Sequence, residues 1–182
     1  MRMVRTKRLI LRQWRQKDRP LFADMCADYL VMEYFPSILS REQSDALLDR
    51  FYRNIELNGW GFWAAERIDT NDFVGFIGMN YSADGLPFAP CVDIGWRLAR
   101  PHWGLGFATE GGRAVLNYAF TQTDLTQLVS MTPVKKLRSR RVMEKLGMFK
   151  SDANFLHPKV PEDSPLQEHV LYKIDKQQWS AQ

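Results

Sequence analysis

The stretch that decides the fold reads Val92-Asp-Ile-Gly-Trp-Arg-Leu98 and, after a short connection, Trp103-Gly-Leu-Gly-Phe-Ala-Thr-Glu110. A strand-like run enters a turn with two glycines, and a helix-like run over 111–120 follows. Glycines at 104 and 106 let backbone N–H groups approach an anion without side-chain interference. The start of the helix adds unpaired N–H donors and the positive end of its dipole. The pattern therefore predicts a phosphate-binding cradle.

The surrounding sequence predicts strands and helices in a mixed order. Strands are predicted over 5–13, 60–67, 73–80, 91–98, 127–132 and 168–175. Helices are predicted from Asp18, from the Ser40-Arg-Glu-Gln43 capping box to Asn58-Gly59, over 111–120, and over 138–146, where Gly147 is the left-handed terminus. Strands 91–98 and 127–132, joined by a helix, predict a right-handed parallel βαβ unit. We expect a single α/β domain over 1–182, with a mixed central sheet flanked by helices.

The composition is that of an ordinary globular protein. Of 182 residues, 45% are hydrophobic and 25% are charged, and the net charge is +4. No apolar run approaches the roughly 20 residues that a membrane helix needs, and the basic N-terminus lacks the apolar segment of a secretory signal. Two cysteines, Cys26 and Cys91, are too few for a disulfide scaffold. We expect a cytoplasmic protein with no membrane partner.

Much of the positive charge gathers between positions 135 and 141. The cluster consists of Lys135, Lys136, Arg138, Arg140 and Arg141. It is interpreted either as a solvated helix face or as a patch beside a phosphate, and charge alone favours the solvated face. A nucleic-acid binder carries a denser basic footprint than this chain, so we expect no nucleic-acid partner.

Two nucleotide-binding motifs fit the glycine turn poorly. A P-loop ends in Gly-Lys-Ser/Thr, whereas the only basic residue near the exit of this turn is Arg113. A dinucleotide fingerprint needs a small residue where Thr109 stands and follows an N-terminal strand, whereas three antiparallel-looking strands precede this turn. Gly-x-Gly alone leaves a strand-to-helix connection without a ligand as the simplest interpretation.

Two longer motifs favour a ligand. The segment Trp103–Glu110 is similar to Trp-Gly-x-Gly-Tyr/Phe-Ala-Thr-Glu, and the segment Lys136–Gly147 looks like Asn-x-x-Ser-x-Arg-Val-Leu/Met-Glu-Lys-Leu-Gly. Both motifs resemble the GNAT N-acetyltransferases, specifically the branch that includes the RimJ/RimL ribosomal-protein acetyltransferases. The opening Thr6–Arg12 and the closing His169–Ile174 also resemble this branch. The resemblance covers nearly the whole chain.

The resemblance implies a GNAT fold, with two parallel strands that splay apart at the coenzyme A site, and direct transfer of acetyl from acetyl-CoA to a primary amine. Backbone N–H groups of 104–109 and the Thr109 hydroxyl would grip the pyrophosphate, and a backbone N–H near Trp96 to Leu98 would polarise the thioester carbonyl. The implied acetyl-CoA contacts are Trp96, Leu98, Trp103, Gly104, Leu105, Gly106, Phe107, Ala108, Thr109, Lys136 and Ser139. No metal is expected.

The acceptor is left open between a protein N-terminus, a small amine and an antibiotic, and the protein between a monomer and a homodimer. Lys136 stands where the family has an Asn that bonds the pantetheine, which suggests a second hypothesis, a CoA-binding module with little catalysis. A third hypothesis is a ribosome- or RNA-associated binder that uses the 135–141 cluster. Trp60, Phe62 and Trp63 either line an acceptor site or pack in the core.

The reaction needs a base, because an amine is protonated at neutral pH. Strand alternation places Asp93, Gly95 and Arg97 on one face. Asp93 is the best candidate, and it would act through water because family members often carry the longer Glu here. The alternative is an ion pair between Asp93 and Arg97. Glu66 is a lesser candidate, whose position is more typical of an exposed charge at a strand end.

The departing thiolate needs a proton donor. Ser139 resembles the serine that the RimL-like branch offers, and its alternative role is to cap the helix that starts there. Tyr118 is expected in the core. His102, His157 and His169 have no evident partner in the sequence, so structural roles are favoured for them.

Overall fold

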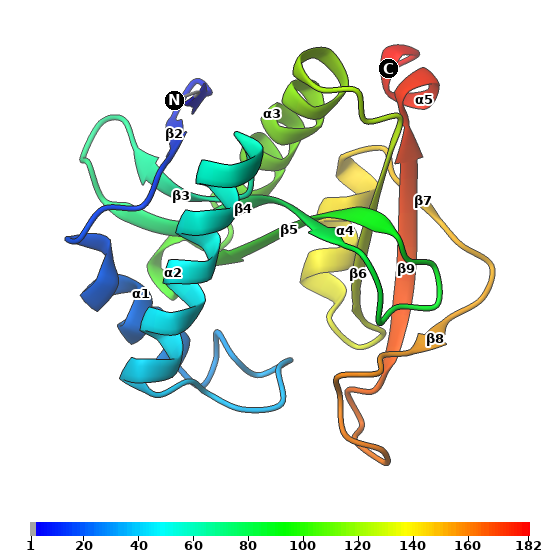
Figure 1. The fold of residues 1–182 in the computed structure, drawn as a ribbon, viewed down its shortest axis with the longest axis horizontal. Helices are drawn as coiled ribbons and strands as arrows, with labels where there is room; N and C mark the ends of the chain where they lie inside the picture. The colour runs from blue at the N-terminus through cyan, green and yellow to red at the C-terminus, as the bar shows by residue number, and fades with distance from the viewer. Residues whose placement is uncertain (1–2) are drawn as a thin grey trace.

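The computed structural model describes residues 3–182 (Figure 1). The strands are β1 (Val4–Arg5), β2 (Leu9–Arg12), β3 (Phe62–Arg67), β4 (Phe73–Ser82), β5 (Cys91–Leu98), β6 (Gln127–Pro133), β7 (Phe149–Lys150), β8 (Phe155–Leu156) and β9 (Glu168–Asp175). The helices are α1 (Asp18–Ala27), α2 (Arg41–Asn58), α3 (Phe107–Gln122), α4 (Leu137–Lys145) and α5 (Lys176–Ser180), with a 3₁₀ turn at Arg100–His102.

Within the described residues the strands form one sheet in the order β1-β2-β3-β4-β5-β6-β9-β7, and β8 also pairs with β9. Of these pairings only β5 with β6 is parallel, and in the described chain it rests on one residue pair, Asp93 opposite Val129. Beyond that pair β6 continues along β9 as far as Pro133 opposite His169. Figure 1 shows β5 running across the view, whereas β6 runs almost vertically beside β9. The half of β5 beyond Asp93 therefore has an edge that β6 does not cover, as expected for a splayed parallel pair.

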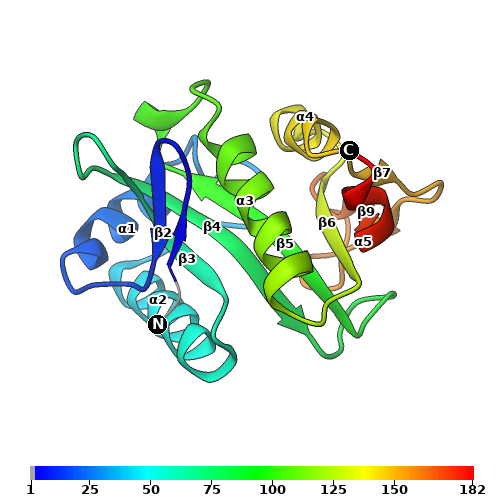
Figure 2. The same ribbon diagram turned by 90° about the horizontal axis from the view of Figure 1, so that it is seen from above.

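Helices cover both faces of the sheet (Figure 2). Adjacent residues of β3 show which helix lies on which face, because neighbouring strand residues point in opposite directions. Phe62 packs against Phe51 of α2, with ring centroids 5.0 Å apart. Trp63 packs against Tyr118 of α3, with centroids 5.4 Å apart. Trp63 and Tyr118 are buried, so Tyr118 lies in the core as predicted, and core packing explains Phe62 and Trp63.

Most element boundaries agree with the sequence patterns. The capping box at Ser40 is formed, Gly59 and Gly147 are left-handed with φ of 74° and 73°, and the last strand spans 168–175. Strands β3 and β4 each differ by two residues at one end, and the largest difference at a helix is in α3, which begins at Phe107 rather than at 111. Gly106 is itself the N-cap of this helix, so the glycine turn and the helix start are one structure.

The predicted first strand is instead a hairpin of β1 and β2. The backbone N–H of Thr6 donates to the carbonyl of Leu9 at 2.9 Å, and this turn interrupts the strand. The polar run Thr6-Lys-Arg8 carries no apolar residue that would continue the alternation.

Both cysteines are free, as their small number predicts, with Cys26 buried and Cys91 half-buried. Among the helices of residues 3–182, none is long and apolar enough to cross a membrane.

Candidate active site

A cleft of about 830 Å³ opens between α4, the start of α3, the uncovered edge of β5 and the segment that follows α1. Of the twelve predicted acetyl-CoA-binding and catalytic residues, ten line this cleft: Trp96, Leu98, Trp103, Gly104, Gly106, Phe107, Ala108, Thr109, Lys136 and Ser139. Two others do not. Leu105 is about half exposed beside the cleft, and Asp93 lies at the point where β5 and β6 part.

The predicted cradle is the N-terminus of α3. Gly104 and Gly106 have φ of 74° and 81°, a backbone conformation that favours glycine. The first hydrogen bond of the helix runs from the Glu110 N–H to the Gly106 carbonyl at 3.0 Å. The N–H groups of Phe107, Ala108 and Thr109 precede that bond, so they are free to bind an anion at the positive end of the helix.

A clasp formed by Thr6, Arg8 and Glu110 holds the cradle to the N-terminal hairpin. The Glu110 carboxylate accepts hydrogen bonds from the Thr6 hydroxyl at 2.6 Å and from the Arg8 backbone N–H at 2.8 Å. The Arg8 guanidinium pairs with the same carboxylate at 2.6 Å and also donates to the Leu105 carbonyl at 3.0 Å. The clasp fixes both the loop and the first turn of α3.

The uncovered edge of β5 presents backbone groups to the cleft. The Ser130 hydroxyl of β6 donates to the Ile94 carbonyl at 2.9 Å, so the backbone polar groups of Ile94 point towards β6. Two residues further along a strand the backbone polar groups point the same way. The N–H and carbonyl of Trp96 therefore face the gap, where β6 has already turned away. The Leu98 carbonyl is occupied by the Trp103 indole N–H at 2.7 Å.

Asp93 accepts a hydrogen bond from the Asn80 amide at 3.2 Å. Burial raises the pKa of this carboxyl to about 6, although the hydrogen bond from Asn80 opposes the rise. The ion pair considered between Asp93 and Arg97 is absent from the described residues. Four strand residues span about 13 Å, and the Arg97 guanidinium turns instead to Cys26, with an N–S distance of 3.4 Å.

Ser139 is not the cap of α4. It is the third residue of the helix, whose N-cap is Lys136, and no side chain caps that end. Ser139 is buried and lines the cleft. Its hydroxyl makes no hydrogen bond to any described residue, so it is available to a bound molecule.

The basic cluster faces the same cleft. Of its five residues, Lys135, Lys136, Arg138 and Arg141 line the cleft, whereas Arg140 donates to the Val134 carbonyl at 3.1 Å. The Arg138 guanidinium lies 4.7 Å from the ring centre of Trp103, beside the cradle. The exposed residues of the cluster, Lys135, Arg138 and Arg141, are in contact with solvent, as charge alone suggests, but they face the open cleft rather than the outer surface of the helix. This placement supports the phosphate-side interpretation.

Glu66 is not an exposed strand-end charge, contrary to the prediction. It is buried and pairs with Arg12 at 2.6 Å and Lys17 at 3.2 Å. Burial alone would raise the pKa of Glu66, but these cations outweigh it and lower the pKa. Arg12 also pairs with buried Asp18 at 2.7 Å. Glu66 thus belongs to a buried ionic cluster that joins β2, β3 and α1, and it is held ionised as a structural group.

Sequence reasoning missed the segment between α1 and α2. Glu33 and Tyr34 from this segment line the cleft, and Phe35 lies beneath two cations. The Arg97 guanidinium is 4.2 Å from the Phe35 ring centre and the Lys136 ammonium 4.7 Å. The signal was a run of aromatic and apolar residues over 29–35 that fits neither helical nor strand spacing. Such a run between two helices indicates a buried or ligand-facing loop.

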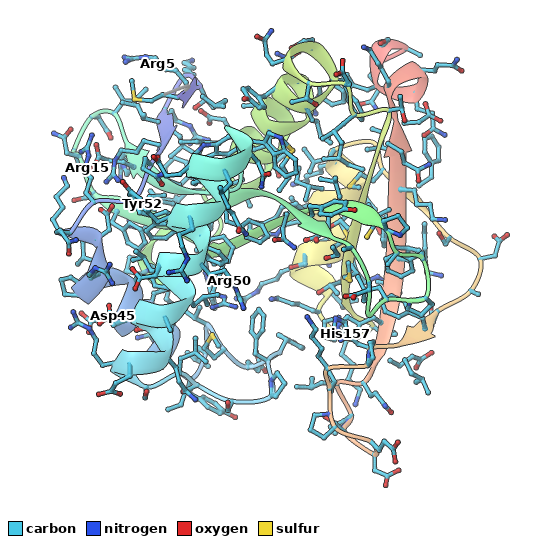
Figure 3. The ribbon with its side chains drawn as sticks, viewed as in Figure 1. Arg5, Arg15, Asp45, Arg50, Tyr52 and His157 are labelled. Carbon is cyan, nitrogen blue, oxygen red and sulfur yellow. The ribbon has the colours of Figure 1, made fainter. Side chains whose placement is uncertain are left out.

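The sequence shows no evident partner for the three histidines, but in the structure each ring contacts another aromatic ring. The rings of His157 and His169 contact each other at a tilt of 45°, with centroids 4.8 Å apart, and His169 contacts the Gln167 carbonyl at 3.0 Å. Burial lowers the pKa of His169 to about 4, so this ring is neutral at pH 7. His157 lies at the β8 end of the molecule, far from Arg5 at the opposite end (Figure 3). His102 stacks edge-on against Phe107 at 6.2 Å.

Comparison with known proteins gives the family. Residues 8–149 match the Acetyltransferase (GNAT) domain. The chain is 31% identical over 147 residues to the uncharacterized protein YkkB of Bacillus subtilis, which covers 80% of this chain and 84% of YkkB. It is 26% identical over 178 residues to the uncharacterized N-acetyltransferase YnaD of the same organism, which covers 97% and 99% of the two chains.

Solved structures share the fold. A GNAT-family acetyltransferase from Bacillus anthracis superposes with a TM-score of 0.80 at 22% identity, covering 97% of this chain and 99% of its own. Two neighbours are CoA complexes: the ribosomal alpha-N-protein acetyltransferase RimL (TM-score 0.76, 13% identity, 96% and 98% covered) and the spermidine N-acetyltransferase of Vibrio cholerae with spermine (TM-score 0.73, 18% identity, 94% and 98% covered). The splayed sheet is thus the GNAT fold, and the chain belongs to the GNAT family of acetyl-CoA-dependent N-acetyltransferases.

Proposed function

We propose that this enzyme transfers the acetyl group of acetyl-CoA to the primary amine of a small molecule or a protein N-terminus, with Asp93 as base and Ser139 as proton donor. The observation that carries the proposal is one continuous cleft. It holds a helix N-terminus with free N–H groups at one end, the uncovered β5 edge in the middle, and an unpartnered serine hydroxyl on the facing helix α4. Each of these groups meets a separate need of acyl transfer.

Acetyl-CoA would lie along this cleft in a fixed direction. Its pyrophosphate would sit on the N–H groups of 104–109, with Thr109 as a further donor and Arg138 and Arg141 as nearby counter-charges. Its pantetheine would extend along β5 like an added strand, because the backbone groups of Trp96 have no strand partner there. This direction brings the thioester towards Asp93.

The chemistry follows from three groups. The amine loses a proton through water to Asp93, whose raised pKa of about 6 keeps it a usable base at neutral pH. The amine nitrogen then attacks the thioester carbon while the Trp96 N–H stabilises the oxyanion. Once the C–N bond has formed, the oxyanion re-forms the carbonyl and the C–S bond breaks, and the Ser139 hydroxyl donates a proton to the departing thiolate. A second proton leaves the nitrogen and restores Ser139, and the products are an amide and free coenzyme A.

The acceptor end of the cleft favours some amines over others. One structural neighbour is named a spermidine acetyltransferase and another is RimL, so polyamines and protein N-termini are both candidates, and RimL supports a place in the RimJ/RimL-like branch. In this chain, however, two cations, Arg97 and Lys136, line the cleft beside the β5 edge. Their charge repels a polycation, so a small amine or a protein N-terminus fits better than a polyamine.

The test is release of free thiol from acetyl-CoA with a panel of amines: spermidine, short peptides with free N-termini, and small amines. The same peptides with acetylated N-termini serve as matched controls. We expect turnover on at least one free amine, loss of about 100-fold or more in Asp93→Asn, and an N-acetyl product by mass spectrometry. Binding of acetyl-CoA with no thiol release above background on any amine would instead support a CoA-binding module.

A further inference from the structure

Two cations at the acceptor end of the cleft have no anionic partner. The Arg97 guanidinium reaches only the neutral Cys26 thiol, at 3.4 Å, and its Nε is buried without a hydrogen-bond partner in the described residues. The Lys136 ammonium makes no hydrogen bond and no ion pair within residues 3–182. A charged group withdrawn from water is unfavourable unless it is paired. Glu33 is near enough to act on the Lys136 charge but forms no ion pair with either cation in the described chain, so one positive charge at this end of the cleft is left unbalanced.

Aromatic rings hold the two cations together. Both lie over Phe35, and Lys136 also lies 5.7 Å from the ring centre of Tyr34. Cation–π contact offsets part of the desolvation cost, but it does not supply a hydrogen-bond acceptor. Burial, with the nearby charge of Arg97, lowers the pKa of Lys136 to about 8, although Glu33 opposes this. Two positive charges are thus held close together by the fold.

The phosphates of acetyl-CoA are the wrong anion for this position. The cradle belongs to α3, which packs on the sheet face that Trp63 occupies. The Arg97 guanidinium lies 5.3 Å from the ring centre of Phe76, and Phe76 packs against Phe51 of α2 on the opposite face. The pantetheine that would pass between these regions is uncharged. The anion must therefore come with the acceptor.

We propose that the acceptor is a primary amine that also carries a carboxylate, which Arg97 and Lys136 bind above Phe35. The inference rests on the proposed acetyl transfer. Arg97 shares its strand face with Asp93. About 13 Å of strand separates the two residues, so a carboxylate bound by Arg97 and an amine that reaches Asp93 through water approach β5 from the same face. Arg97 and Lys136 carry two positive charges, and the nearby Glu33 carboxylate carries one negative charge, which leaves a net charge of one. One carboxylate would neutralise this charge, whereas a phosphate dianion would bring one negative charge too many. Arg97 and Lys136 set specificity and are not part of the proton transfer.

The first test compares matched acceptors in the thiol-release assay. Each pair consists of an amino acid and the amine that remains without its carboxylate: phenylalanine and 2-phenylethylamine, β-alanine and ethylamine, 6-aminohexanoate and pentylamine. Phosphoethanolamine is the phosphate counterpart of β-alanine. We expect at least one amino acid to exceed its partner by about tenfold or more in kcat/KM, the effect of a charge-assisted hydrogen bond. Equal use of both members of every pair, or preference for phosphoethanolamine, contradicts the proposal.

The second test changes the two cations. Lys136→Asn and Arg97→Met should each lower the ratio of kcat/KM for the preferred amino acid to kcat/KM for its partner amine about tenfold, while Arg97→Lys should retain part of the preference. Arg5→Met and Lys7→Asn carry the same changes on exposed residues of the N-terminal hairpin, at the edge where Figure 3 shows Arg5. Equal losses on both members of the pair would assign Arg97 and Lys136 a structural role and overturn the proposal.

A binding measurement separates this inference from the proposed function. Calorimetry measures the binding of 3-phenylpropanoate to the CoA-saturated protein. This molecule has the carboxylate and the ring of phenylalanine but no amine. Binding that Lys136→Asn and Arg97→Met abolish supports the carboxylate site even when no amine is acetylated, in which case only the proposed acetyl transfer fails. Absence of binding at millimolar concentration, together with no preference for any amino acid, overturns the inference while leaving acetyl transfer to other amines intact.

Discussion

The two ends of the cleft are built in different ways. At the cradle, recognition is by backbone: free N–H groups of 107–109 follow two left-handed glycines within one short segment. At the acceptor end, recognition is by side chains that four separate elements contribute. Arg97 comes from β5, Lys136 precedes α4, Phe35 lies in the segment after α1, and Asp93 is held by Asn80 of β4. Most side-chain substitutions near the cradle would leave its backbone N–H groups in place, whereas a substitution at the acceptor end removes a group that contacts the acceptor.

This difference predicts how the two ends respond to substitution. Changes at the cradle should alter acetyl-CoA binding for every acceptor alike. Changes at the acceptor end should alter the rate or the choice of acceptor while acetyl-CoA still binds.

The largest effect is expected from Gly106→Trp. A side chain at a φ of 81° is strained, by about 1–2 kcal/mol. A Cβ at this position would lie 3.5 Å from the Arg8 guanidinium, so the indole would also disturb the clasp that holds the first turn of α3. We expect acetyl-CoA affinity to fall about 1,000-fold or more, measured by calorimetry. Gly85→Trp is the matched control, because Gly85 has a φ of 77° and open space around it but lies outside the residues that line the cleft. Unchanged affinity in Gly106→Trp would show that the cradle is misassigned.

Asp93→Asn should act on rate rather than on acetyl-CoA binding. Loss of a general base lowers kcat about 100-fold to 1,000-fold. In the parent enzyme kcat/KM should rise with pH through about 6, as the carboxyl with its raised pKa ionises, and this limb should vanish in the variant. A pH–rate profile and acetyl-CoA titration check both points, and an unchanged acid limb in Asp93→Asn would exclude Asp93 as the base.

Stability gives an independent control for this variant. The Asp93 carboxyl has a higher pKa in the folded than in the unfolded state, so its ionised form disfavours folding. The free energy of unfolding should therefore fall as pH rises through 4 to 6. The shift corresponds to a cost of up to about 3 kcal/mol above pH 6. Asp93→Asn should therefore be as stable as the parent or more stable at pH 8, and its loss of rate is not a loss of fold.

The contrast between the backbone-built cradle and the side-chain-built acceptor end explains which parts of the site could be predicted from the sequence. The cradle and the α4 block are each contiguous in the sequence. Local pattern therefore points to Gly104 and Gly106 as an anion cradle, and the resemblance of the second block to the family motif points to Ser139. Glu66 was misjudged because its partners, Arg12 and Lys17, are about fifty residues away in sequence. Phe35 was missed for the same reason, since only the folded chain brings it beneath Arg97 and Lys136.

Ser139→Ala tests the facing wall of the cleft, and a smaller effect is expected. The hydroxyl has no partner among the described residues, so its removal leaves no buried group unsatisfied and should not lower the melting temperature. We expect kcat to fall about tenfold while acetyl-CoA affinity changes about threefold at most. Ser130→Ala is the informative comparison, because Ser130 donates to Ile94 on the same strand edge. A fall in affinity with unchanged kcat would make Ser139 a binding residue only.

Glu110→Gln should loosen the cradle without removing it. The carboxylate joins Thr6 and Arg8 to the first turn of α3, but Arg8 is 45% exposed, so the pair contributes only about 1 kcal/mol. We expect the KM for acetyl-CoA to rise about fivefold with kcat unchanged for all acceptors. Glu42→Gln, an exposed acid in the first turn of α2, controls for the helix dipole and should leave KM unaltered. An effect that depends on the acceptor would contradict the separation of the two ends.

The smallest effect expected is a pH dependence at the acceptor end, and its sign is opposite for binding and for stability. Lys136 has a pKa of about 8, lowered by burial and by Arg97, and Glu33 opposes the shift. His169, neutral at pH 7 with its pKa of about 4, also feels this charge. Only the protonated ammonium attracts a carboxylate, so affinity for 3-phenylpropanoate should fall about threefold between pH 7 and 9, with Arg97 retaining the remainder. The charged form is also the form that folding disfavours, so stability should rise as pH rises from 8 towards 10.5. Lys136→Asn should abolish both trends, whereas a binding trend that survives in this variant would assign it to another group.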